Sequence, residues 1–156
     1  MTRLSIAYLA DHLAAVPALA EWLAREWGDG RPEMSVERLV DRLARLDSRD
    51  KLPICLLGLL NGEPVATATL KFREIEYARA ADFWLGSVYV REDARGRGHG
   101  RAIVAAAEAV AAAKRFTPLY LYTPRKEALY GRLGWQTVGE TLADGKRATV
   151  MSKEAE

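Results

Sequence analysis

Residues 88–100 read Val-Tyr-Val-Arg-Glu-Asp-Ala-Arg-Gly-Arg-Gly-His-Gly and lead directly into an apolar segment of helical character. Glycines let a backbone turn so that several N–H groups converge, and a following helix adds free N–H groups and the positive end of its dipole. Arginines at positions 95, 97 and 101 add charge-assisted hydrogen bonds. The stretch therefore predicts a phosphate-binding loop, with a merely solvated loop as the alternative.

The glycine spacing distinguishes this loop from three other nucleotide- or nucleic-acid-binding segments. A P-loop ends in Gly-Lys-Ser/Thr, whereas residues 100–102 read Gly-Arg-Ala. A dinucleotide-binding loop reads G-x-G-x-x-G, with an acidic residue closing the next strand, whereas residues 122–124 read Tyr-Thr-Pro. Arg-Gly-rich RNA-binding segments are usually disordered and repetitive, and the net charge of +2 also counts against RNA.

The segments around the loop predict a mixed α+β fold. Residues 83–90 are typical of a strand, and with a helix at residues 101–115 and a strand at 119–122 they form a parallel crossover. Further strands are expected at residues 3–8, 53–60, 65–72, 135–141 and 148–153, and further helices at residues 11–27, 35–46 and 126–133. We expect a mostly antiparallel sheet of six or seven strands in a single domain over residues 1–156.

Local signals mark the ends of several of these elements. Asn61-Gly62 and Asp144-Gly145 favour tight hairpin turns. Ser35 is expected to cap the second helix. Asp11 is the candidate cap of the first helix, unless Pro17 delays or bends its start.

The composition is ordinary for a globular protein, with 49% hydrophobic and 28% charged residues. No secretory signal opens the chain, and the longest apolar stretches are far shorter than a membrane span, so we expect a soluble, cytoplasmic protein. The only cysteine, Cys55, excludes an internal disulfide and fits a buried thiol in a reducing compartment.

Two motifs resemble the markers of one known family. Residues 95–100, Arg-Gly-Arg-Gly-His-Gly, match the R/Q-x-x-G-x-G/A signature of the GNAT superfamily of acyl-CoA-dependent N-acetyltransferases, and residues 88–90 look like its central strand. Residues 128–135, Ala-Leu-Tyr-Gly-Arg-Leu-Gly-Trp, resemble its second marker, a tyrosine four residues before a Gly-aromatic pair. The markers have the expected order and separation, and on these residues the chain is identified as a member of this superfamily.

The resemblance implies transfer of an acetyl group from acetyl-CoA, the cosubstrate, to a primary amine of a small molecule or peptide by direct attack in a ternary complex. It also implies helices on both faces of the sheet and a CoA loop on the parallel crossover. Loop amides would cradle the pyrophosphate, and the central strand would pair with the pantetheine arm. The cofactor-binding residues implied in this way are Val88, Tyr89, Val90, Arg95, Gly96, Arg97, Gly98, His99, Gly100, Arg101 and Thr123.

Tyr130 resembles the family's tyrosine that protonates the departing thiolate. A phenol is a proton donor at neutral pH, which suits this role. The alternative is that Tyr130 is only the packing residue of a short helix. No metal, nucleic acid or membrane partner is expected, and the protein would be a monomer or homodimer.

The sequence departs from the family at the central strand. Many relatives carry a glutamate there as the base for the amine, whereas residues 83–90 contain no carboxylate. The base stays unassigned among Asp82, Glu74, Glu76 and His12, and His99 is expected to be exposed or on the cofactor. A non-catalytic acyl-CoA-binding regulatory domain is therefore the alternative function.

Overall fold

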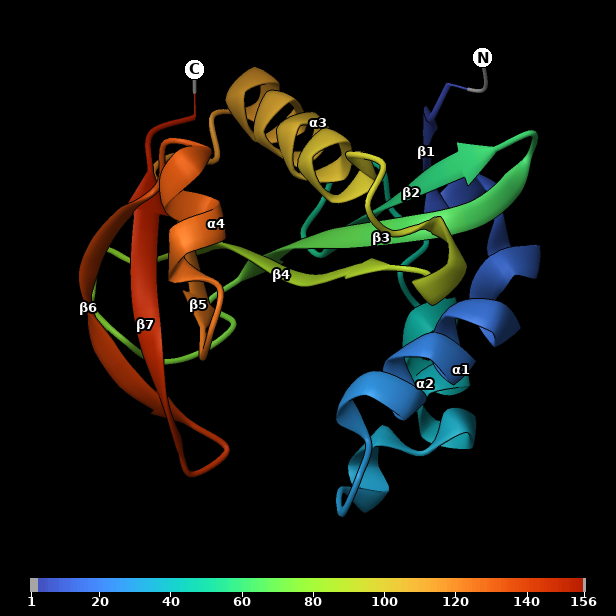
Figure 1. Ribbon diagram of the computed structural model, residues 1–156, viewed down its shortest axis with the longest axis horizontal. Helices are drawn as coiled ribbons and strands as arrows, with labels where there is room; N and C mark the ends of the chain where they lie inside the picture. The colour runs from blue at the N-terminus through green and yellow to red at the C-terminus, as the bar shows by residue number, and fades with distance from the viewer. Residues whose placement is uncertain (1–2, 156) are drawn as a thin grey trace. The chain divides into compact units, whose positions relative to one another are not determined.

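The computed structural model describes residues 3–155, which form a mixed sheet with helices packed on it (Figure 1). The strands of this described part are β1 (Ser5–Tyr8), β2 (Ile54–Leu60), β3 (Glu63–Phe72), β4 (Phe83–Val90), β5 (Leu119–Thr123), β6 (Gln136–Ala143) and β7 (Lys146–Lys153). The α-helices are α1 (Val16–Trp27), α2 (Val36–Ala44), α3 (His99–Lys114) and α4 (Glu127–Arg132). Short 3₁₀ turns are η1 (Leu9–Asp11), η2 (Leu13–Ala15), η3 (Pro32–Met34) and η4 (Glu92–Ala94).

Within residues 3–155, seven strands form one sheet in the order β1-β2-β3-β4-β5-β7-β6. The pairs β1–β2, β5–β7 and β6–β7 are antiparallel. β4 and β5 run parallel and pair at two positions, Phe83 with Leu119 and Trp84 with Tyr120. Because α3 lies between these two strands in the chain, the predicted mixed sheet with one parallel β-α-β crossover is confirmed.

The described chain divides into two compact units. Unit 1 comprises residues 3–69 and 87–104, and unit 2 comprises residues 70–86 and 105–155. β3, β4 and α3 each contribute residues to both units. The single domain over residues 1–156 stays a prediction.

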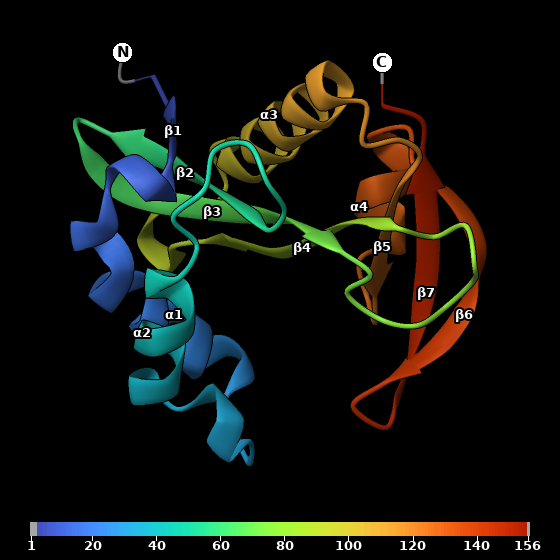
Figure 2. The same ribbon diagram turned by 180° about the vertical axis from the view of Figure 1, so that it is seen from behind.

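The core of unit 1 lies between α1, α2 and β2. The odd-numbered side chains Cys55, Leu57 and Leu59 of β2 pack into one cluster with buried residues of both helices. Ile54 and Leu56 point to the opposite face by alternation and are also buried. Figures 1 and 2 show the start of α3 on that opposite side, so helices cover both faces of this strand.

The helix starts in unit 1 follow local rules, and of the two alternatives for the first helix the later start at Pro17 is confirmed. Ser35 caps α2 as expected, because its Oγ accepts a hydrogen bond from the Arg38 N–H at 3.3 Å. Asp11 does not cap α1, since it belongs to η1 and α1 begins at Val16. Pro17 lies in the first turn of α1, where a missing N–H is tolerated, so the proline marks the helix start.

The sheet of unit 2 carries an aromatic cluster on one face. Trp84 is fully buried, and its indole N–H donates to the Ala81 carbonyl at 2.8 Å. The half-buried Tyr77, Tyr120 and Tyr122 pack against it with ring centroids 5.4–6.5 Å from that of Trp84. These rings make one wall of unit 2 apolar with polar hydroxyl tips.

Polar contacts join the helices of unit 2 to β7. The Lys153 ammonium donates to Glu108 Oε1 at 2.6 Å and to the Leu133 carbonyl at 2.7 Å. The Trp135 indole donates to Glu108 Oε2 at 3.2 Å. The resulting network links α3, the end of α4 and β7.

Both predicted hairpin turns are present. Asn61 and Gly62 have φ angles of 52° and 80°, and Asp144 and Gly145 have φ angles of 53° and 76°. Two successive positive φ angles are the signature of the type I′ turn, so the Asn-Gly and Asp-Gly pairs act as the sequence indicated.

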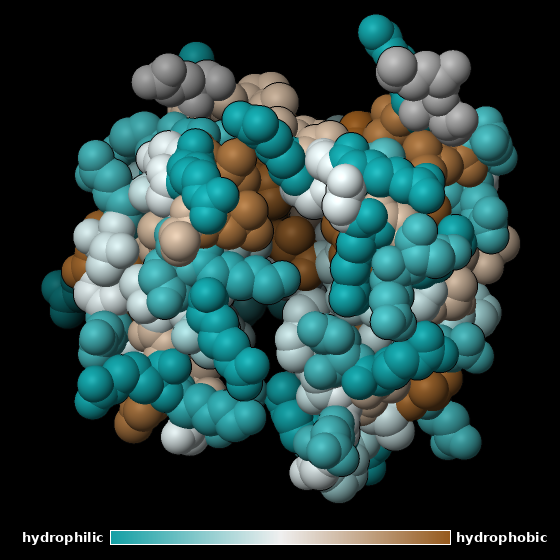
Figure 3. Space-filling model, in the orientation of Figure 1, coloured by the Kyte–Doolittle hydropathy of each residue, from teal (hydrophilic) through white to brown (hydrophobic). Residues whose placement is uncertain are grey.

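Most of the surface in view in Figure 3 is hydrophilic, and hydrophobic residues gather there in separate patches. Within residues 3–155, no helix has the length and apolar character needed to cross a bilayer.

Candidate active site

The glycine–arginine loop, residues 91–100, connects β4 to α3 in unit 1. After η4 the chain passes through Gly96 and Gly98, with φ angles of 80° and 83°. A Cβ atom added at either glycine would meet nothing within 4 Å. Glycine is therefore needed at these two positions for the backbone conformation and not for space.

The loop ends in the free N-terminus of a long helix. The Ala102 N–H donates to the Gly98 carbonyl at 3.1 Å, which starts the helical ladder, and α3 begins at His99, two residues before the predicted start. The N–H groups of the first turn precede that ladder and have no helical acceptor. Two glycines with positive φ precede this helix end, and such a combination is typical of an anion-binding site.

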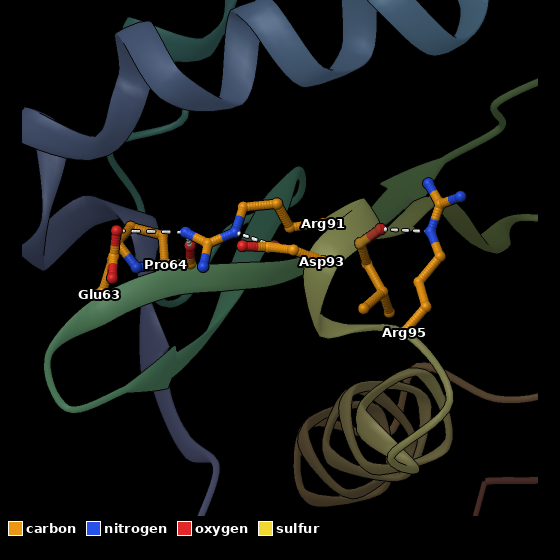
Figure 4. Close-up of polar contacts among 6 residues, drawn as sticks. Glu63, Pro64, Arg91, Asp93 and Arg95 are labelled. Atoms are coloured by element: carbon orange, nitrogen blue, oxygen red, sulfur yellow. Dashed lines mark hydrogen bonds and ion pairs between the residues drawn. The ribbon is translucent and has the colours of Figure 1, made fainter.

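The arginines of the loop divide into two groups. Arg95 Nε donates to the Val90 carbonyl at 2.9 Å (Figure 4). The Arg95 guanidinium also lies 5.2 Å from the centre of the Tyr89 ring. Arg97 and Arg101 are exposed and form no ion pair or hydrogen bond within residues 3–155. Their charges are available to an anion.

Arg91 is bound to carboxylates and does not join the other arginines. Its Nε donates to Asp93 at 2.6 Å and its Nη1 to Glu63 at 3.2 Å, and Figure 4 shows it pointing away from Arg95. The hydrogen bond to Asp93 raises the pKa of Arg91 and lowers the pKa of Asp93. The positive charge of Arg91 is thus balanced by neighbouring carboxylates.

The other predicted residues of unit 1 lie on β4 and at the start of α3. Tyr89 is buried, with its ring 5.9 Å from those of Trp22 and Trp27, so its side chain serves the α1 cluster and only its backbone is available to a ligand. Val88 and Val90 are half-buried. Of the two expectations for His99, exposure is wrong, because the residue is 9% exposed and its Nε2 has no partner within residues 3–155, whereas contact with the cofactor stays a prediction.

β4 contains a local irregularity that sequence reasoning missed. Ser87 has a φ angle of 51°, in the left-handed region that non-glycine residues rarely adopt. Such strained residues cost about 1–3 kcal/mol and cluster at functional sites. No residue type in the strand signals this change of direction.

Tyr130 lies on α4 in unit 2. The residue is 8% exposed, and burial raises the pKa of its phenol. Its ring packs against Trp135 with centroids 6.2 Å apart, whereas its hydroxyl forms no hydrogen bond within residues 3–155. The ring is a packing element, and the hydroxyl keeps its proton and is free to donate it.

Thr123 also belongs to unit 2, at the end of β5. It is 5% exposed, and its Oγ1 accepts a hydrogen bond from the Lys126 N–H at 3.0 Å. The hydroxyl therefore shapes the turn into α4, a local role that the sequence did not indicate. Thr123 and Tyr130 lie in unit 2, and the glycine–arginine loop lies in unit 1.

The four candidate bases differ in their surroundings. Asp82 is paired with Arg73, with Nε and Nη2 at 2.9 and 2.8 Å from Oδ1. His12 and Glu76 are exposed. The Glu74 side chain is 13% exposed and lies against Gly86 of β4, a contact that no local sequence signal reveals.

The chain matches the acetyltransferase (GNAT) family over residues 16–135. No curated protein sequence matches it significantly. Among solved structures, an aminoglycoside 6'-N-acetyltransferase complexed with coenzyme A has a TM-score of 0.76 and 16% identity, covering 97% of each chain. A GNAT-family acetyltransferase from Streptococcus pneumoniae has a TM-score of 0.71 and 17% identity over 99% of this chain and 100% of that one.

An acyl-CoA N-acyltransferase from Pseudomonas aeruginosa has a TM-score of 0.65 and 23% identity, covering 98% of this chain and 99% of that one. At such identities these structures show a common fold. The family match covers the glycine–arginine loop and Tyr130 together. The protein belongs to the acetyltransferase (GNAT) family.

Proposed function

We propose that this protein transfers an acetyl group from acetyl-CoA to a primary amine of a small molecule or peptide. The observation that carries the proposal is the glycine–arginine loop, in which two positive-φ glycines lead into the N-terminus of α3. Membership of the acetyltransferase family supports it. The fold shared with an aminoglycoside acetyltransferase complexed with coenzyme A points the same way.

The residues of the loop fit a pyrophosphate. The amides of residues 95–100 would bind the phosphate oxygens, with Arg95, Arg97 and Arg101 adding charge-assisted hydrogen bonds. The backbone of residues 88–90 would pair with the pantetheine arm. Thr123 would offer its hydroxyl proton to the cofactor, because its oxygen is the atom that accepts from Lys126.

Tyr130 would protonate the departing thiolate. Burial raises its pKa, so the phenol stays protonated at neutral pH, and its hydroxyl has no competing partner within residues 3–155. Holding the amine and thioester together in a ternary complex would supply much of the rate advantage. Cys55 is 1% exposed, which supports direct attack without a covalent enzyme intermediate.

A cytoplasmic location and a monomeric or homodimeric state belong to the same proposal. The lone buried thiol of Cys55 suits a reducing compartment. The near-neutral net charge of +2 favours small-molecule or peptide partners over nucleic acid.

The function is tested by incubating the protein with acetyl-CoA and four amines: kanamycin, spermidine, phenethylamine and a lysine-containing peptide. Release of free CoA thiol and a mass gain of one acetyl group on the amine are measured together. We expect turnover with at least one amine. Acetyl-CoA binding without any acetylated product would contradict the proposal and favour the non-catalytic acyl-CoA-binding domain.

A further inference from the structure

Acylation of an amine releases a proton from nitrogen, and a positioned base speeds such a reaction. β4 contains no carboxylate of its own. The loop between β3 and β4 brings one to it, because the carboxylate of Glu74 lies directly on Gly86 in the middle of the strand.

The contact explains why residue 86 is a glycine. A Cβ atom at position 86 would overlap Glu74 Oε2 and come within 2.7 Å of Oε1 and 2.8 Å of the carboxylate carbon. Gly86 is not among the glycines with positive φ, so the backbone conformation does not require it. The absence of a side chain therefore makes room for the carboxylate of Glu74.

Glu74 is held in place but keeps acceptor capacity. Its side chain is 13% exposed, and Oε2 lies 3.1 Å from the Lys71 ammonium. Oε2 is nevertheless a buried atom without a hydrogen-bond partner within residues 3–155. A buried carboxylate oxygen without a hydrogen-bond partner can accept a hydrogen bond from a ligand.

The carboxylate also lies beside an aromatic wall. Side chains alternate along a strand, so Gly86 faces the same side of the sheet as Trp84, whose partner on β5 is Tyr120. Pairing of β4 with β5 covers Phe83 and Trp84, and Gly86 follows two residues later. Aromatic faces next to a carboxylate attract a cationic amine.

We propose that Glu74 is the general base for the acceptor amine, a role that rests on the proposed acetyl transfer. The amine nitrogen forms a bond to the thioester carbonyl carbon, the C–S bond breaks, and the thiolate takes the proton of Tyr130. The proton lost by the nitrogen passes to Glu74, directly or through water. Solvent then carries a proton from Glu74 to Tyr130, which restores both residues.

The experiment compares Glu74→Gln with Glu76→Gln, an exposed glutamate of the same loop. Turnover with acetyl-CoA and the four amines above is measured from pH 6 to 9, together with acetyl-CoA affinity by calorimetry. We expect Glu74→Gln to lower kcat by about 100-fold or more across this pH range, with acetyl-CoA affinity within about twofold. Glu76→Gln should match the wild type.

A second variant, Glu74→Asp, controls for misfolding of Glu74→Gln. It keeps the negative charge but shortens the side chain by one methylene. It should lose only part of the activity, because a carboxylate remains near Gly86. If both Glu74 variants fold by circular dichroism and turn over within about threefold of Glu76→Gln, Glu74 is not the base. If the wild type itself acetylates none of the amines, the proposed function fails, and the role of Glu74 fails with it.

Discussion

Glycines do different things in two regions of this molecule. In the glycine–arginine loop of unit 1, Gly96 and Gly98 have positive φ angles and open space around them. At Gly86 on β4, in unit 2, the φ angle is not positive and the space for a Cβ is filled by the Glu74 carboxylate. Gly96 and Gly98 set the left-handed conformation of the loop that we propose to bind a ligand, whereas Gly86 makes room for another side chain of the same protein.

The comparison teaches that one residue type can mark a site by two physical routes. Substitution of a glycine with positive φ is unfavourable because an L side chain strains the left-handed backbone. Substitution of a glycine that leaves room for a neighbouring side chain is unfavourable because the added methyl group displaces that side chain. The two routes predict different partners in double mutants.

Gly86→Ala should have the largest effect. The added methyl group displaces the Glu74 carboxylate, so kcat should fall by about 100-fold, as for loss of a general base. The double variant with Glu74→Gln should be no slower than Glu74→Gln alone, because both changes remove the same group. Gly131→Ala, on an open face of α4 with no atom within 4 Å, is the matched control and should keep the wild-type rate.

Tyr130→Phe should lower kcat by about tenfold or more by removing the proton for the thiolate. Acetyl-CoA affinity by calorimetry should change little, since the proposed phosphate contacts belong to residues 95–101. Steady-state kinetics with the best amine of the panel measures the effect. Unchanged turnover would mean that Tyr130 is only the packing partner of Trp135.

Gly98→Ala should weaken acetyl-CoA binding by about tenfold, because the left-handed backbone costs an L residue about 1–2 kcal/mol. Gly30→Ala is the matched control, since Gly30 also has a positive φ of 70° and open space around it. Both variants should lose similar unfolding free energy in urea, but Gly30→Ala should keep the affinity for acetyl-CoA. If the two variants bind acetyl-CoA with equal affinity, Gly98 does not contribute to acetyl-CoA binding.

The smallest effect concerns alkaline stability. Burial raises the pKa of Tyr130 in the folded state, so its contribution to stability is complete below the unfolded tyrosine pKa and is lost as the pH rises through the folded value. The melting temperature of the wild type should therefore fall more steeply above pH 10 than that of Tyr130→Phe. If the melting temperatures of the wild type and Tyr130→Phe change in parallel from pH 8 to 11, ionisation of the Tyr130 phenol does not lower the stability of the fold.

Features set by neighbouring residues could be predicted from the sequence. The Asn61-Gly62 turn, the Ser35 cap and the positive-φ glycines of the glycine–arginine loop each depend on a few adjacent positions. Pro17 likewise indicates the later start of the first helix, because α1 begins at Val16. The parallel crossover followed from element order.

Features set by distant contacts could not be predicted. Glu74 lies against a glycine 12 positions away, and Arg91 pairs with Glu63 on β3. His99 is buried although its loop neighbours Arg97 and Gly98 are exposed. None of these outcomes has a periodic or compositional signal, because each depends on the packed fold.

The central claim is that the glycine–arginine loop binds the pyrophosphate of acetyl-CoA. Calorimetric titration of acetyl-CoA, with ATP and NAD as controls, tests it in the wild type and in the double variant Arg95→Ala/Arg97→Ala. We predict micromolar binding of acetyl-CoA over both controls, and a loss of about tenfold or more in the double variant. Folded wild-type protein that does not bind acetyl-CoA, or a double variant that binds as tightly as the wild type, would contradict the claim.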